Sequence, residues 1–67
     1  MKILFENSQG QKREIGSGTR KECFDVMNKF LADHKFKSYY TIETKLPNGD
    51  SRLDVGSHTE FFYLVEK

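Results

Sequence analysis

The sequence predicts an α+β fold, with one helix packed on a mostly antiparallel sheet of four to five strands in the order β-β-α-β-β-β. Two observations carry this prediction. A run from about Thr19 to Lys35 has apolar residues at helical spacing, and Pro47-Asn48-Gly49 forms a turn between two strand-like segments. The 67 residues are predicted to form a single domain, spanning 1–67. A chain of this length buries only about 60% of its unfolded surface, so its core is thin.

The N-terminal part of the chain predicts a hairpin. Lys2 to Glu6 is rich in strand-forming residues and is followed by the polar turn residues 7–10. Gln11 to Ile15 is predicted to return as a second strand. Because this segment is highly charged, we expect it at an edge of the sheet. Gly16-Ser17-Gly18 is predicted to break the chain before the helix.

The helix has a clear start in the sequence. Thr19 and Glu22 have the spacing of a capping box, in which each side chain binds the backbone N–H of the other residue. One helix face is predicted to be apolar, and it carries Cys23, Val26, Met27, Phe30, Leu31 and His34. The opposite face alternates in charge, with Lys21, Asp25, Lys29 and Asp33.

Three strands are predicted after the helix. Ser38 to Leu46 alternates in character, and its inward side chains are predicted to be Tyr40, Ile42, Thr44 and Leu46. Ser51 to Val55 returns from the turn with Leu53 and Val55 inward. Glu60 to Glu66 is apolar on both sides, which is typical of a central strand.

The last strand also predicts a binding surface. One helix covers only one face of a sheet, yet both sides of this strand are apolar. We therefore expect Phe62 and Leu64 either to face solvent or to be covered by a partner.

Composition limits the kinds of site. Cys23 is the single cysteine, so the monomer has no disulfide, and one Cys with two His falls short of a zinc ligand set. No cofactor is predicted. No secretory signal or apolar run of membrane-spanning length is visible, so we expect a cytoplasmic protein with no membrane contact.

Nucleic acid is the alternative partner. Net charge is only +1, but residues 12–37 hold seven Lys/Arg and four Asp/Glu, a local excess of +3. The basic and aromatic residues that would bind phosphates and bases are Lys35, Lys37, Tyr39, Arg20 and Lys21. Against this, the exposed helix face alternates in sign, which suits a major groove poorly.

A third hypothesis is a small hydrolase-like site at His58. In an extended segment, residues two apart point the same way, so Glu60 could orient the imidazole, with Asp54 nearby. A simpler interpretation is a wide turn with His58 exposed.

The segments Ser38-Tyr39-Tyr40 and 54–62 resemble parts of small uncharacterised proteins encoded by phages and prophages. The resemblance covers the second half of the chain and brings no known activity or site residues. It implies a context in which tiny proteins bind host proteins or nucleic acid rather than catalyse.

The sequence therefore predicts a non-enzymatic protein-interaction module, with a protein partner or a second copy as its partner. Its predicted surface consists of Phe62, Leu64 and Tyr39.

Overall fold

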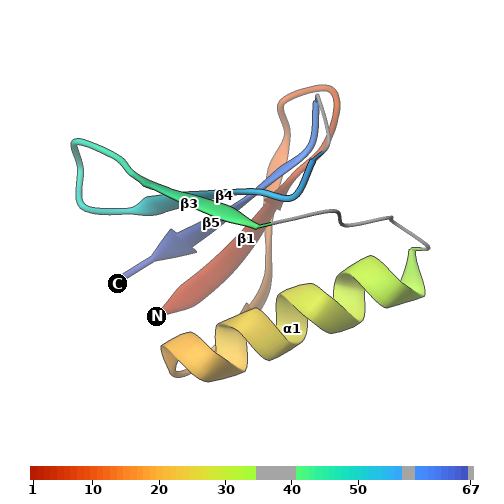
Figure 1. The fold of residues 1–67 in the computed structure, drawn as a ribbon, viewed down its shortest axis with the longest axis horizontal. Coiled ribbons are helices and arrows are strands. Elements are labelled where there is room, and N and C mark those ends of the chain that lie inside the picture. The colour runs from red at the N-terminus through yellow and green to blue at the C-terminus, as the bar shows by residue number, and fades with distance from the viewer. Residues whose placement is uncertain (35–40, 57–58, 67) are drawn as a thin grey trace.

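The computed structural model describes residues 1–34, 41–56 and 59–66. In these residues one helix and five strands form an α+β fold, as predicted (Figure 1). The elements are β1 (Lys2–Glu6), β2 (Lys12–Ser17), α1 (Arg20–Asp33), β3 (Ile42–Lys45), β4 (Ser51–Asp54) and β5 (Phe61–Val65).

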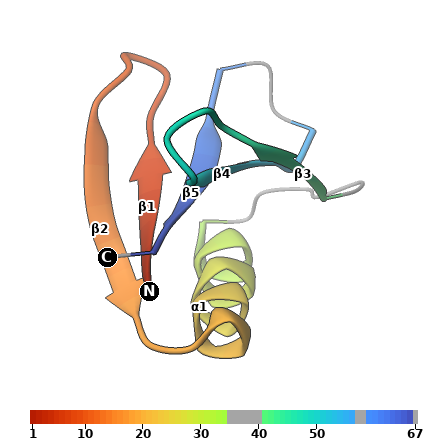
Figure 2. The same cartoon turned by 90° about the vertical axis from the view of Figure 1, so that its left-hand side faces the viewer.

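The five strands form one antiparallel sheet in the order β2-β1-β5-β4-β3 (Figure 2). β5 lies at the centre, between β1 and β4, which confirms the position predicted from its apolar character. β2 lies at one edge, as predicted from its charge, and β3 lies at the other.

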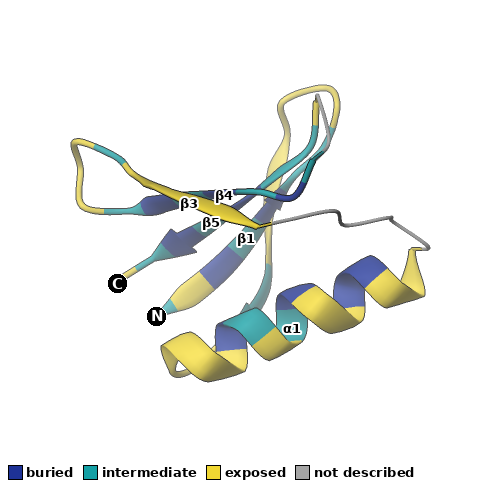
Figure 3. Ribbon diagram, in the orientation of Figure 1, coloured by how far each residue is buried: buried dark blue, intermediate teal, exposed yellow. Residues whose placement is uncertain are grey.

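The hydrophobic core lies between α1 and the sheet face that α1 covers (Figure 3). The helix contributes Cys23, Met27, Phe30 and Leu31, all buried. The sheet contributes Ile3, Phe5, Leu53, Phe62 and Leu64, with Val55 just after β4. Three rings form the centre of this core, because Phe5 lies 4.6 Å from Phe30 and 5.3 Å from Phe62 between ring centroids.

The capping box fixes the start of α1, as predicted. The Thr19 hydroxyl accepts from the Glu22 N–H at 3.2 Å, and the Glu22 carboxylate accepts from the Thr19 N–H at 3.0 Å. Two N–H groups that the helix leaves unpaired are satisfied in this way. At the other end His34 is the C-cap, and its Nδ1 lies 3.0 Å from the Phe30 carbonyl oxygen.

The predicted break at residues 16–18 is partly wrong, because Gly16 and Ser17 belong to β2. Their strand partners are Ile3 and Lys2. A β-bulge near Ile15 shifts the register between the two strands. The extra residue lets two neighbouring residues, Ile15 and Gly16, both lie toward α1.

The hairpin predicted at residues 47–49 is confirmed. The Gly49 N–H donates to the Leu46 carbonyl at 3.0 Å, and the Leu46 N–H donates to the Asp50 carbonyl at 2.8 Å. The loop therefore has three residues, with Gly49 at a φ of 92°. Pro47 holds its φ near −65°, which suits the first central position of this turn.

The predicted inward side of the third strand is wrong. Ile42 and Thr44 pair with Asp54 and Arg52, so they lie on the side of the sheet away from α1. Ile42 is 53% exposed. Glu43 lies on the side toward α1 and accepts hydrogen bonds there. The apolar side chain of Ile42 therefore lies on the opposite side.

Candidate binding surfaces

The first candidate surface is the sheet face that points away from α1, which we call the open face. Directly opposed residues of an antiparallel pair point to the same side, so the register assigns each residue to a face. The open face carries Lys2, Leu4, Glu6, Lys12, Glu14, Ser17, Ile42, Thr44, Arg52, Asp54, Phe61, Tyr63 and Val65. The four apolar or aromatic residues of β1 and β5 on this face are half-buried.

Phe62 and Leu64, predicted as surface residues, lie on the covered side instead. Their exposed fractions are 1% and 2%. They pair with Phe5 and Ile3, which face α1, so the helix of the same chain buries them. The prediction that Phe62 and Leu64 lack a covering element in this chain is therefore wrong. The side chains of this strand that α1 does not cover are the other alternating set, which includes Phe61 and Tyr63.

Long cationic side chains cover the aromatic rings of the open face. The Lys12 Nζ lies 4.2 Å from the centre of the Tyr63 ring, and the Arg52 guanidinium carbon lies 5.1 Å from that of Phe61. The Tyr63 hydroxyl donates to the Glu6 carboxylate at 3.0 Å. Burial, followed by this carboxylate, raises the pKa of the Tyr63 phenol above its ordinary value.

The charges of the open face cancel. Three cations and three carboxylates give a sum of zero, and they are Lys2, Lys12, Arg52, Glu6, Glu14 and Asp54. Among the described residues, this face forms one direct ion pair, between Lys2 Nζ and Glu14 at 3.5 Å. A polyanion on this face would therefore meet carboxylates as often as cations.

Arg20 and Lys21, predicted as phosphate contacts, are both engaged with carboxylates of this chain. The Arg20 guanidinium binds Glu43, with Nη1 3.2 Å from Oε2, and the Lys21 Nζ lies 2.9 Å from an oxygen of Asp25. Glu43 also accepts from the Ser51 hydroxyl at 2.8 Å. The first turn of α1 is thus both capped and charge-paired.

Four other predicted site residues, Lys35, Lys37, Tyr39 and His58, lie outside the described residues. Their roles therefore stay predictions.

The described neighbours of the hydrolase-like site have structural partners. An oxygen of Asp54 accepts from the Gly56 N–H at 2.9 Å, which forms a local turn after β4. Cys23 is fully buried, as expected for a core thiol. The described part of the chain contains no group of three or more His, Cys, Asp or Glu side chains placed to hold a metal ion.

The second candidate surface consists of two hollows beside the edge strand β2, the second of which is also lined by α1. One hollow of about 440 Å³ is lined by Phe5, Asn7, Gln11, Lys12 and Arg13. A second, of about 270 Å³, is lined by Ile15, Val26, Lys29, Phe30 and Asp33. Phe5 lines the first hollow and Phe30 lines the second, and their ring centroids lie 4.6 Å apart. We call them together the β2–α1 groove.

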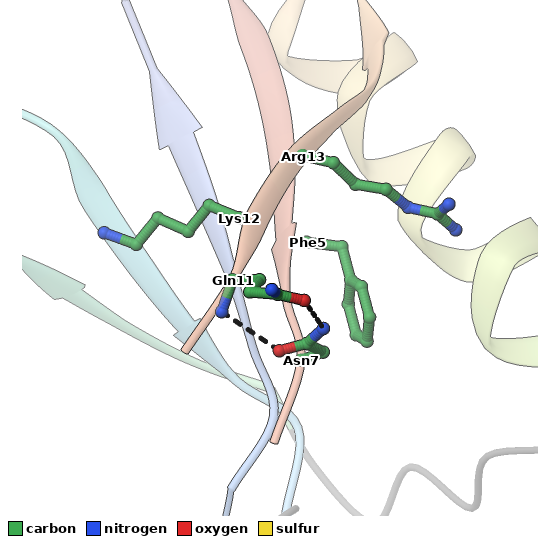
Figure 4. Close-up of a pocket in the computed structure, with 5 residues that line it drawn as sticks. All are labelled: Phe5, Asn7, Gln11, Lys12 and Arg13. Atoms are coloured by element: carbon green, nitrogen blue, oxygen red, sulfur yellow. Dashed lines mark hydrogen bonds between the residues drawn. The ribbon is translucent and has the colours of Figure 1, made fainter. Parts of the chain in front are cut away.

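The strand residues at the first hollow point in different directions (Figure 4). Phe5 and Arg13 point toward α1, whereas Lys12 points to the opposite side of the sheet. The Arg13 guanidinium carbon lies 5.9 Å from the centre of the Phe30 ring. Asn7 and Gln11 bind one another at 3.1 Å and close the end of the hairpin.

Sequence reasoning missed the residues that give these two surfaces their character. Phe61, Tyr63 and Lys29 were not predicted to bind anything. The residues from which the open face could have been predicted are Ile3 and Phe5. Because these residues are the most apolar alternating pair of the first strand, they must face the helix and so orient the neighbouring last strand.

No protein-family model, curated protein or solved structure matches the chain. Among the described residues, no helix has the length and apolar character needed to cross a membrane.

Proposed function

We propose that this chain is a non-enzymatic protein-interaction module that binds through its open face, with a second copy of the chain as partner. One observation carries the proposal. The central strand β5 presents apolar side chains on both sides, and α1 covers only the side with Phe62 and Leu64. Phe61, Tyr63 and Val65 remain half-buried on the other side.

Charge supports a protein partner over nucleic acid. The open face has a net charge of zero, from three cations and three carboxylates. Nucleic-acid sites concentrate positive charge, since phosphate contacts supply most of their affinity. A face with both signs supplies cations and carboxylates that can pair with each other across a symmetric dimer interface.

The size of the face predicts a weak complex. Five strands at about 4.8 Å spacing and five residues at about 3.3 Å rise cover roughly 400 Å² of flat area. Two copies would bury on the order of 800 Å², below the roughly 1,200 Å² of stable interfaces. Dissociation constants between about 10 μM and 1 mM are therefore expected, which correspond to roughly −7 to −4 kcal/mol.

Sedimentation equilibrium and amide NMR shifts over this concentration range test the proposal. Ile42→Asp places a carboxylate on the open face at an exposed edge position. Because the new carboxylate lies opposite Asp54, a small loss of stability is expected, and a thermal melt checks that the variant is folded. Asn28→Asp is the matched control, because it makes the same charge change on the exposed side of α1.

The expected result is concentration-dependent association, with shifts at open-face amides, that Ile42→Asp weakens and Asn28→Asp leaves unchanged. A wild-type chain that stays monomeric at about 1 mM would contradict the proposal. So would open-face shifts produced by a single-stranded nucleic-acid probe at low salt, where the phosphate contribution is strongest.

Two further parts of the proposal concern context. We propose a cytoplasmic location, which the single, buried, unpaired thiol of Cys23 supports. We also propose a phage or prophage origin, on the resemblance of residues 38–40 and 54–62.

A further inference from the structure

The β2–α1 groove combines an apolar floor with an edge strand. Phe30 and Phe5 lie at its base with exposed fractions of 8% and 9%, and Ile15 and Val26 are half-buried beside them. Within the described residues β2 pairs only with β1, so its outer backbone edge has no strand partner. An extended peptide can add to such an edge, with its backbone bonded to the strand and alternate side chains in the neighbouring groove.

Charge in the groove is unbalanced. Most described cations on other surfaces lie within 4 Å of a carboxylate, namely Lys2, Arg20, Lys21 and Lys45. Arg13 and Lys29 line the groove, are exposed, and form no ion pair with the described residues. Asp33 is the one carboxylate among the described lining residues. The groove therefore has a surplus of positive charge beside an apolar floor.

The Arg13 guanidinium is also positioned to bind a carboxylate. Arg13 lines the first hollow, its guanidinium carbon lies 5.9 Å from the centre of the Phe30 ring that lines the second, and Figure 4 shows it extending toward α1. A carboxylate there would gain charge-assisted hydrogen bonds, and the ring limits the positions of the guanidinium.

We propose that the β2–α1 groove binds an extended acidic peptide segment of a protein partner, which adds to β2 as a sixth strand. Apolar side chains of the peptide pack on Phe30 and Ile15, and its carboxylates contact Arg13 and Lys29. Successive side chains of a strand alternate in direction, so the recognised residues are two apart in the peptide.

The charges on β2 also supply selectivity. Lys12 and Arg13 are adjacent, and edge strands with such residues resist pairing with arbitrary strands. The bulge near Ile15 interrupts the regular ladder, which keeps the added strand short. Affinity must then come from side-chain contacts, so a basic or purely polar strand is rejected.

A display library of random peptides of about six residues, an ordinary strand length, is the probe. The full chain is the bait, and the double variant Arg13→Glu/Lys29→Glu is the counter-selection bait. Both positions are exposed, so the fold should tolerate the change. If that variant does not fold, Arg13→Gln/Lys29→Gln removes the two charges without adding new ones. Lys21→Glu, on the outer side of the same helix, is the control for a charge reversal outside the groove.

The expected outcome is enrichment of peptides with Asp or Glu alternating with apolar residues. Their binding should weaken about tenfold in the double variant, because reversing two charges turns attraction into repulsion. Lys21→Glu should leave it unchanged, and amide shifts should map to β2 and α1. Enrichment of basic sequences, no enrichment, or equal loss in Lys21→Glu would each overturn the inference. Shifts confined to the open face would also overturn it, because the peptide would then bind a different surface.

Discussion

Gly16 allows α1 to approach β2 closely, and its replacement by alanine tests this packing directly. A methyl group at this position would lie 2.8 and 2.9 Å from the two Cγ atoms of Val26. Ordinary carbon contacts are about 3.5 to 4.0 Å. A helical valine has one strongly preferred rotamer, so Val26 cannot turn away easily. Either the helix or the strand must move.

The change in the free energy of unfolding caused by Gly16→Ala follows from two opposing effects. Overpacking of this kind costs about 1 to 3 kcal/mol. Replacing glycine by alanine at a compatible backbone also removes unfolded-state entropy, which stabilises by about 0.4 to 1 kcal/mol. The net expectation for Gly16→Ala is a loss of about 1 kcal/mol. For 67 residues this lowers the melting temperature by roughly 7 °C.

The effect of Gly16→Ala on stability should change sign when Val26 is shortened to alanine. Val26→Ala alone removes two half-buried carbon atoms, at a cost of about 1 kcal/mol. It also vacates the space that the alanine methyl needs. In the Val26→Ala background, Gly16→Ala should therefore be neutral or stabilising by up to about 1 kcal/mol.

Urea denaturation followed by circular dichroism measures all four members of this cycle. The slope of the unfolding free energy against urea concentration should be the same in all four proteins. A constant slope shows that stability, rather than the surface exposed on unfolding, has changed. If Gly16→Ala costs the same in both backgrounds, the contact with Val26 is not the cause and the reasoning fails.

Three further predictions concern stability. Thr19→Ala removes half of the capping box and should cost about 1 kcal/mol in thermal melts, whereas Thr19→Ser should retain most of it. Hydrogen bonding to Arg20 lowers the pKa of Glu43, so its stabilisation is present above the unfolded pKa of about 4.3 and is lost as pH falls through the folded value. The melting-temperature difference between wild type and Glu43→Gln should accordingly shrink on acidification, and a constant difference would contradict this assignment. Phe62→Ala should cost about 3 to 5 kcal/mol and leave much of the chain unfolded by circular dichroism, while Ile42→Ala should stay within about 0.5 kcal/mol of wild type.

Local signals in the sequence were sufficient for the order and type of the elements. The Thr19 and Glu22 pair defined the start of the helix, and Pro47 to Gly49 defined a hairpin, because both depend on residues close in the chain. The central position of the last strand also followed from its apolar character on both sides.

The orientation of the last strand could not be derived in the same way. Phe61, Tyr63 and Val65 alternate with Phe62 and Leu64, so either set could face the helix on apolar character alone. The choice depends on pairing with β1, where Ile3 and Phe5 are the core residues. That pairing joins residues about sixty positions apart, beyond the reach of a local pattern.

The prediction of which side of the edge strand β3 faces the helix was wrong for a related reason. Ile42 is more apolar than Glu43, yet Glu43 lies on the covered side because Arg20 and Ser51 provide hydrogen bonds there. The second candidate surface was missed as well. Arg13 and Lys29 come from separate elements, and only the packing of α1 beside β2 brings them to one groove.

The central place of β5 has a consequence for how the sheet opens. The other four strands form two hairpins, β1 with β2 and β3 with β4, which share no strand-to-strand hydrogen bonds with each other. Departure of β5 would therefore separate the sheet into two halves and uncover Phe62 and Leu64 at once. Amide protons of β5 should exchange with solvent only through global unfolding, whereas those on the outer sides of β2 and β3 exchange through local fraying.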